Sequence, residues 1–393
     1  MRLPNDSQLS REQKEVCFAP TDQTILIKGP PGSGKTVIAI FRQNALRRQK
    51  KDVATVVYNH VLRRYTGIDQ TFYAWLGNWW RRCTGRSFPY AYVAVGDGER
   101  THRVYDYEQA AKLATTELKD AIVRRGHWGH LILDEAQDFN KKAHMFLFAV
   151  RNFVFGGSGK QATPSMTILA DENQRLNSEN SSIQEIKSAH LIADGDVYDL
   201  RRNYRNTRQI AAFAGQFYVG LPTGIPELPE RTGDKPRIIL THDINDATER
   251  IVNYARLHES EEIGVLVYYD NTRRSLSNKL KHRLQHSPIA VQTYSSKEGT
   301  DAAELEFDEG GRVTVLCFAS AKGLEFDALF IVELQAMPVR DDQILTAKMN
   351  LYVMSSRARE RLFLMVSDTE RQHSIWKLLS LDESCAELEG IPS

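Results

Sequence analysis

The fold of this chain is decided by the eight residues Gly29-Pro30-Pro31-Gly32-Ser33-Gly34-Lys35-Thr36, which follow the apolar run Ile25–Ile27. They match the pattern G-x-x-x-x-G-K-[ST] of a phosphate-binding loop, placed between an expected strand and an expected helix. In such a loop, backbone N–H groups point inward around the phosphates, Lys35 adds positive charge, and the Thr36 hydroxyl can ligate Mg²⁺. The residues expected to contact a nucleotide are Gly29, Pro30, Gly32, Ser33, Gly34, Lys35 and Thr36.

A second element ends in two acids. The apolar run Leu131–Leu133 is followed by Asp134 and Glu135. A carboxylate at the end of a buried parallel strand can hold Mg²⁺, and its neighbour can orient and deprotonate an attacking water. Strand ends often carry charge, but beside a phosphate loop this pair predicts hydrolysis rather than binding alone. Thr36 and Asp134 are then the expected metal ligands, and Glu135 is the expected base.

Composition places the chain among globular proteins with a sizeable core. Of its 393 residues, 41% are hydrophobic and 26% are charged, which excludes a disordered or fibrous protein. Because 51 Lys and Arg residues nearly balance 50 Asp and Glu residues, any nucleic-acid binding must come from a local basic groove. No apolar run approaches the ~18–20 residues that cross a bilayer, and no signal peptide is evident. Four widely spaced cysteines are typical of a reducing compartment. We therefore expect a cytoplasmic protein without a membrane partner.

Short apolar runs alternate with helical stretches almost throughout the chain. This alternation predicts βαβ units and mostly parallel sheets. A second strand–helix series starts near residue 200 and predicts a domain boundary there. The candidate strands are 24–28, 54–58, 131–133, 167–170, 237–240, 264–268, 313–318 and 328–333. The candidate helices are 35–48, 140–153, 207–218, 246–258, 272–286 and 347–359.

The segment 72–92 contains eight aromatic residues in 21 and no acid. Its basic residues are Arg81, Arg82 and Arg86. Aromatics interleaved with arginines could stack on single-stranded nucleic acid and neutralise it. Alternatively, the tryptophans form the core of a small insertion, since Trp75 and Trp79 lie one helical turn apart on one face. The second interpretation is favoured for the tryptophans and still leaves some arginines to contact nucleic acid.

The phosphate loop and the acid pair are part of a longer series that resembles superfamily 1 helicases of the UvrD/Rep type. The segment Asp134-Glu135-Ala136-Gln137-Asp138 is that family's form of motif II and is far more specific than two acids alone. Further segments resemble the Q motif and motifs III, IV, V and VI, in the family's order. They are Leu9–Gln13, Ala170–Gln174, Asn203–Thr207, Ala321–Asp327 and Leu351–Ala358.

The resemblance implies roles in nucleotide binding. Gln13 would hydrogen-bond to the edge of the adenine, and Tyr204 would pack on its face. Gly323 and Glu325, both in the motif V segment, would lie against the nucleotide. ATP with Mg²⁺ is therefore the expected cofactor pair.

It also implies three groups that stabilise the γ-phosphate in the transition state, namely Gln174, Arg205 and the arginine finger Arg357. Arg205 and Arg357 lie far in sequence from Lys35, so both reach one phosphate only if two domains face each other across the nucleotide. The expected fold is α/β, with two RecA-like P-loop NTPase domains of parallel sheets at 1–200 and 201–393. A small aromatic and basic insertion is expected at about 72–128. The expected catalytic residues are Lys35, Asp134, Glu135, Gln174, Arg205 and Arg357.

The side of the family pattern that faces nucleic acid differs in this chain. After motif III, relatives carry a base-stacking segment, whereas this chain has 175–178, Arg-Leu-Asn-Ser. There is also no room for the family's two large insertion domains. The resemblance implies an ATPase that moves along or remodels nucleic acid, with single-stranded DNA favoured over RNA.

The alternative function is an ATP-dependent switch or sensor subunit that gates a partner effector protein, for example in bacterial defence against phage. The small size and the altered base-stacking segment favour this alternative. It would have little unwinding activity of its own. A small-molecule P-loop kinase is disfavoured, because it would need neither motif V nor a distant arginine finger.

Overall fold

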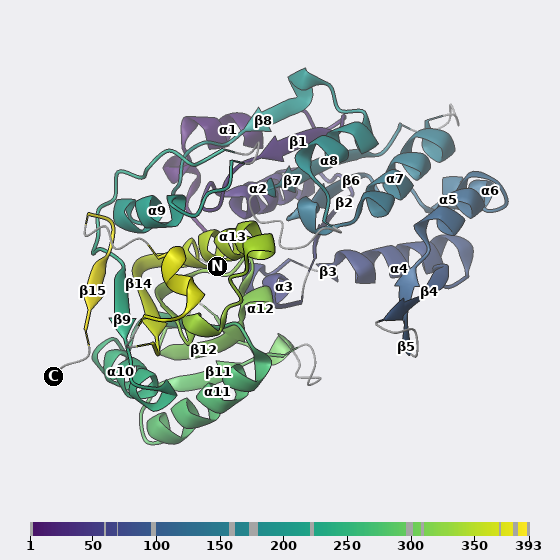
Figure 1. Cartoon of the computed structure of the whole chain (residues 1–393). Coiled ribbons are helices and arrows are strands. Elements are labelled where there is room, and N and C mark those ends of the chain that lie inside the picture. Colours follow the sequence, from purple (N-terminus) through teal and green to yellow (C-terminus); the bar gives the residue numbers. More distant parts are fainter. Residues whose placement is uncertain are drawn as a thin grey trace.

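Two parallel β-sheets with helices packed against them organise the chain (Figure 1). The computed structural model describes residues 3–58, 60–68, 70–95, 100–156, 162–172, 180–220, 224–295, 302–307, 310–368, 371–379 and 384–390. Within these residues, every strand pair of the two large sheets is parallel. This confirms the predicted α/β class with two RecA-like sheets. No helix in the described part of the chain is both long and apolar enough to cross a bilayer.

The first sheet has the strand order β3-β2-β6-β7-β1-β8. Its strands are β1 (Ile25–Lys28), β2 (Val53–Val57), β3 (Gln70–Thr71), β6 (His130–Leu133), β7 (Ser165–Ala170) and β8 (Val197–Asp199). The helices of this half are α1 (Arg11–Cys17), α2 (Lys35–Arg48), α3 (His60–Thr66), α4 (Phe72–Thr84), α5 (Tyr107–Thr115), α6 (Lys119–Arg125), α7 (Lys141–Ala149) and α8 (Ile183–His190). The part from α1 to β8 is called the first unit.

The second sheet has the strand order β11-β12-β10-β13-β14-β9-β15. Its strands are β9 (Arg237–Leu240), β10 (Glu262–Val267), β11 (Ala290–Thr293), β12 (Arg312–Cys317), β13 (Phe326–Ile331), β14 (Ala358–Val366) and β15 (Glu387–Glu389). Its helices are α9 (Arg208–Gly215), α10 (Ile244–Leu257), α11 (Asp270–Leu284), α12 (Phe318–Ala321) and α13 (Ile344–Ser355). The part from α9 to β15 is called the second unit.

One predicted helix extends too far. The helix expected over 347–359 ends at Ser355, and β14 begins at Ala358. Pairing with β13 and β9 on either side of β14 outweighs the local helical pattern. Arg357 therefore lies in the turn before the strand, and Arg359 lies on the strand itself.

A lobe formed by α4, α5, α6 and the antiparallel hairpin of β4 (Tyr90–Val95) and β5 (Arg100–Tyr105) projects from the first sheet (Figure 1). Helix α4 begins after Thr71, whose side chain caps it, and ends at Gly85, which has a φ of 71°. Trp75, Trp79 and Trp80 are buried on the inner face of α4. The interpretation of the tryptophans as the core of this lobe is thus confirmed.

The two units share an apolar core. Leu62 and Tyr65 of α3, in the first unit, belong to the same buried cluster as Leu324 and Phe326 of the second unit. The Cβ that any other residue would have at Gly323 would lie 2.6 Å from the Leu62 side chain, so the chains approach closely here. Helix α3 therefore forms part of the contact between the two units.

The same strand-to-turn device occurs once in each unit. Glu135 follows β6 and Glu333 follows β13, and both have left-handed backbones, with φ of 54° and 55°. In each case the glutamine two residues later donates a hydrogen bond to the glutamate, at 2.5 Å from Gln137 and 2.8 Å from Gln335. The amide oxygen of each glutamine accepts a backbone N–H beyond the neighbouring strand.

Candidate nucleotide site

A pocket of about 550 Å³ lies between the two units, and both units line it. The first unit contributes the phosphate loop, and the second contributes the segment before β13 and the start of β14. The predicted site residues that line the pocket are Gln13, Gly32, Gly34, Lys35, Thr36, Glu135, Tyr204, Arg205, Gly323 and Glu325. The structure thus gathers residues that are up to about 300 positions apart in sequence.

The phosphate loop needs its glycines for steric reasons. Gly32 and Gly34 have φ of 81° and 87°, which other residues rarely adopt. A Cβ at Gly32 would lie 2.4 Å from Oδ1 of Asn203, and a Cβ at Gly34 would lie 2.4 Å from Nε2 of Gln13. Gln13 Nε2 also donates to the Ser33 carbonyl at 3.2 Å. The loop is therefore held from outside by the Q-motif glutamine and by the turn that follows β8.

The loop's own polar groups suit a phosphate. Lys35 Nζ donates to the carbonyls of Gly29 at 2.7 Å and Pro30 at 3.1 Å, and lies 3.6 Å from Asp171. The buried Ser33 Oγ has no hydrogen-bond partner among the described residues. A buried hydroxyl without a partner is costly, and a bound phosphate oxygen would satisfy it.

A hydroxyl and a carboxylate at the start of α2 and the end of β6 fit a magnesium ion. Thr36 Oγ1 donates to Asp134 Oδ2 at 2.7 Å. Mg²⁺ is usually bound by one or two carboxylates together with substrate phosphates and waters. Accordingly, the described residues contain no cluster of three or more His, Cys, Asp or Glu side chains that could hold a metal alone.

The two neighbouring carboxylates have opposite pKa shifts. Burial and the charge of Glu135 raise the pKa of Asp134 to about 7. Burial opposes ionisation of Glu135 too, but the charges of Lys35 and Lys322 lower its pKa. Of the two carboxylates, Glu135 is the one whose charged form these surroundings favour.

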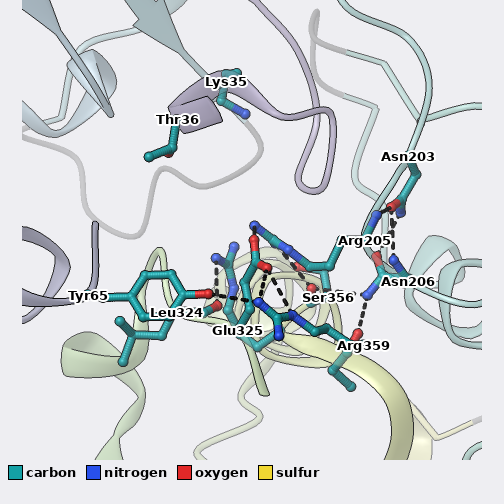
Figure 2. Close-up of polar contacts among 12 residues, drawn as sticks. Lys35, Thr36, Tyr65, Asn203, Arg205, Asn206, Leu324, Glu325, Ser356 and Arg359 are labelled. Atoms are coloured by element: carbon teal, nitrogen blue, oxygen red, sulfur yellow. Dashed lines mark hydrogen bonds and ion pairs between the residues drawn. The ribbon is translucent and has the colours of Figure 1, made fainter. Parts of the chain in front are cut away.

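The wall opposite the phosphate loop is a pair of arginines joined by one glutamate. Arg205 lies in the turn between β8 and α9, whereas Glu325 and Arg359 belong to the second unit. Glu325 lies 2.6 Å from Arg205, and it accepts hydrogen bonds from Arg359 Nε at 3.1 Å and Nη2 at 3.0 Å. Arg359 also donates to the hydroxyl of Tyr65, on α3 of the first unit, at 3.1 Å. Although burial opposes it, the two guanidinium charges lower the pKa of Glu325 to about 2. Figure 2 shows this cluster on one side of the site and Lys35 and Thr36 on the other.

Arg359 is a pocket residue that the sequence analysis did not identify, whereas Arg357, the expected finger, does not line the pocket. Arg357 is fully buried and its Nε donates to the Val353 carbonyl at 3.0 Å. Burial, followed by the charge of Arg205, lowers the pKa of Arg357 to about 10, while Glu135 acts in the opposite direction. Arg357 is therefore close to the site electrostatically, and its role as a finger stays a prediction.

The turn after β8 contacts both units. The Tyr204 N–H donates to the Gly32 carbonyl at 2.8 Å, and the Tyr204 hydroxyl donates to Glu12 at 3.0 Å. Two residues later, the side chain of Asn206 donates to the Ser356 carbonyl at 3.1 Å. The turn thus connects the phosphate loop to the segment that carries Arg357.

A buried ion pair also connects the units. Lys322, before β13, contacts Asp138, which lies at the end of the DEAQD segment and also accepts a hydrogen bond from Asn180 at 3.1 Å. Both side chains of the pair are less than 8% exposed. Gln174 and the segment 175–178 lie outside the described residues, so their expected roles stay predictions.

Comparison with known proteins places these features in a family. No curated protein matches the chain. One similar solved structure is the C-terminal domain of a possible DNA helicase from Lactobacillus plantarum WCFS1, with 22% identity and a TM-score of 0.35 over 47% of this chain and 97% of that chain. The model of Schlafen group 3, DNA/RNA helicase domain, matches residues 22–299. This match spans more than half of the chain and includes the phosphate loop, the DEAQD segment and Arg205. The chain therefore belongs to the Schlafen group 3 family of DNA/RNA helicase domains.

Proposed function

We propose that this helicase-like chain hydrolyses ATP between its two units and uses the cycle to move along or remodel nucleic acid. The observation that carries the proposal is the pocket between the units, lined by a phosphate loop on one side and by the cluster of Arg205, Glu325 and Arg359 on the other. A site divided between two units changes shape when its ligand changes, which is how ATP hydrolysis drives motion. The finer likeness to UvrD/Rep helicases is part of this proposal.

The roles of the residues follow from their positions. Lys35 and the loop N–H groups would bind the phosphates, and Thr36 with Asp134 would hold Mg²⁺, which neutralises developing charge. Glu135 would take a proton from the attacking water. Arg205 would stabilise the γ-phosphate from the turn between the two units, together with the expected groups Gln174 and Arg357. Tyr204 and Gln13, which line the same pocket, would contact the adenine as the resemblance implies.

The ATPase rate of the full chain, measured in parallel with no polymer, single-stranded DNA, duplex DNA and single-stranded RNA, tests this function. We expect activity that needs Mg²⁺ and rises with a single-stranded polymer, DNA being favoured. Lys35→Ala should abolish it. The matched control Lys281→Ala, which alters an exposed lysine on α11, should not. No hydrolysis under any of the four conditions would refute the proposal.

A second candidate is an ATP-dependent switch that gates a partner protein. The buried pair of Lys322 and Asp138 favours it, because the pair joins the acid segment of the first unit to the motif V segment of the second. Rearrangement at the nucleotide would then be transmitted to an outer surface without any polymer. ATPase activity that is unaffected by all three polymers would support the switch over the motor.

A further inference from the structure

Four tyrosines form a continuous row from the end of β2 to the projecting hairpin, and they are called the aromatic row. Tyr58 and Tyr73 have ring centroids 6.0 Å apart, Tyr73 and Tyr105 are 5.5 Å apart, and Tyr105 and Tyr90 are 5.3 Å apart. At the far end, the Arg103 guanidinium lies 3.2 Å from the centroid of Tyr90. The row thus joins three separate elements of the first unit.

Tyr58 and Tyr73 of the row, and Tyr92 beside it, are open to solvent, whereas Tyr90 carries Arg103 on one face and Tyr105 packs on Phe88. Neighbouring rings meet at 65°, 70° and 62°, so the edge of one ring meets the face of the next. Tyr58 is 37% exposed and Tyr73 is 38% exposed. Tyr92, which is 73% exposed, lies opposite Arg103 in the hairpin and on the same face as Tyr90, because alternate residues of a strand share a face.

The lobe does not need these rings for its core. Trp75, Trp79, Trp80 and Phe88 already fill it and are almost fully buried. Only Tyr105 packs flat on this core, with its ring 4.6 Å from that of Phe88 at an angle of 29°. Tyr105 therefore anchors the row, while its other members lie along the surface.

Positive charge accompanies the row. Arg81 and Arg82 are exposed in the last turn of α4. Burial raises the pKa of Tyr105, and the charges of Arg103 and Arg81 oppose this rise, so both groups lie within electrostatic reach of the ring. Aromatic faces combined with a basic surface suit a single-stranded polyanion with exposed bases.

The row also adjoins the candidate nucleotide site. Tyr58 follows β2, and its ring lies 5.8 Å from that of the buried Phe139. Phe139 comes directly after the DEAQD segment that contains Asp134, Glu135 and Asp138. A base that stacked on Tyr58 would be connected to this segment through two rings, those of Tyr58 and Phe139.

We propose that the aromatic row and Tyr92 form a stacking surface for the bases of a single-stranded nucleic acid, with Arg81 and Arg103 near its phosphates. This inference rests on the proposed function. It adds that the polymer is single-stranded and that its path follows the aromatic row. Stacking is sequence-tolerant, since every base has a π-face. The surface would supply the aromatic rings that the segment 175–178, Arg-Leu-Asn-Ser, does not contain.

Fluorescence anisotropy of the full chain tests this, with labelled 20-mers of thymidylate, of abasic deoxyribose phosphate and of duplex DNA. The abasic strand has the same charge without bases, and we expect it to bind about tenfold more weakly. Tyr58→Leu/Tyr73→Leu keeps apolar bulk, removes two π-faces and should lose about tenfold for thymidylate but little for the abasic strand. Equal affinity of the wild type for the two strands, or tighter binding of the duplex, would overturn the proposal.

Two further variants keep the test decisive. Tyr92→Leu alters one exposed ring and should weaken thymidylate binding several-fold even if the double variant does not fold. Phe153 is 58% exposed and lies outside the row. Phe153→Leu should therefore leave the affinity for thymidylate unchanged. If Phe153→Leu weakens binding as much as Tyr92→Leu, the row is not the site.

The ATPase rates under the four conditions given above separate failure of this proposal from failure of the proposed function. Base-dependent binding without any ATPase activity would refute the motor and leave the stacking surface standing. ATPase activity together with equal affinity for the thymidylate and abasic strands would refute the stacking surface and leave the motor standing.

Discussion

Replacing Glu325 by glutamine removes the only negative charge between Arg205 and Arg359 in the described cluster while it keeps the shape of the side chain. The glutamate side chain is 18% exposed, and the two arginines are 13% and 15% exposed, so solvent screens the three groups weakly. The variant leaves two guanidinium groups facing each other without their shared carboxylate. We therefore expect Glu325→Gln to unfold more easily at neutral pH.

The magnitude follows from the pKa. A carboxyl group whose pKa falls from 4.5 to about 2 gains about 3 kcal/mol at ~1.4 kcal/mol per pKa unit. Because the folded-state pKa is below the unfolded-state pKa, this contribution is complete above about pH 5 and is lost as the pH falls towards 2. The difference in unfolding free energy between wild type and Glu325→Gln should thus be about 3 kcal/mol at pH 7, and about half of it should be gone by pH 3.

Urea unfolding of both proteins between pH 3 and pH 7, followed by far-UV circular dichroism, measures this difference. Glu117→Gln is the control, since Glu117 pairs with Arg86 at a site where both side chains are more than half exposed. The control should cost less than about 1 kcal/mol at any pH. A Glu325→Gln protein as stable as the wild type at pH 7, or a difference independent of pH, would refute the reasoning.

Four other outcomes are expected. Glu135→Gln should bind ATP and lose turnover, because the proposed base is gone; equilibrium binding and single-turnover hydrolysis measure this, and a wild-type rate would exclude Glu135 as the base. Arg357→Ala should lower kcat by ~10³-fold or more with ATP affinity changed far less; steady-state kinetics that show equal losses would indicate a structural arginine instead. Lys322→Met should cost about 3–5 kcal/mol by leaving the Asp138 carboxylate buried without its cation, and the double variant with Asp138→Asn should cost less in urea unfolding; additive losses would contradict the ion pair. The isolated chain should separate tailed duplexes poorly in a strand-displacement assay at low and moderate salt, and unwinding of tens of base pairs by the monomer would contradict this.

The parts of the site that the sequence predicts are those in which chemistry and local spacing coincide. The phosphate loop is one continuous stretch of sequence, and so is the Asp134–Glu135 pair. Each immediately follows a buried strand, so the position of each relative to the first sheet follows from the local sequence. The tryptophans of α4 were predictable for a similar reason, because helical periodicity alone places Trp75 and Trp79 on one buried face.

The parts of the site that the sequence does not predict depend on strand pairing between segments distant in sequence. Arg359 lines the pocket only because β14 pairs with β13 in a register that brings it beside Glu325 and Asp327. No local pattern distinguishes it from Arg357, two residues earlier. The aromatic row likewise depends on the pairing of β4 with β5, which the sequence analysis did not anticipate.

The paired strand-to-turn devices at Glu135 and Glu333 separate what the turn needs from what the neighbouring carboxylate adds. A left-handed glutamate supported by a glutamine two residues later is an uncommon arrangement, and it is present after β6 and again after β13. In the second unit, Val332 stands where the first has Asp134, and no phosphate loop is present in its sequence. The turn therefore forms without the aspartate, so Gln137 serves to hold the backbone, and Asp134 is the residue that the proposed Mg²⁺ site adds to it.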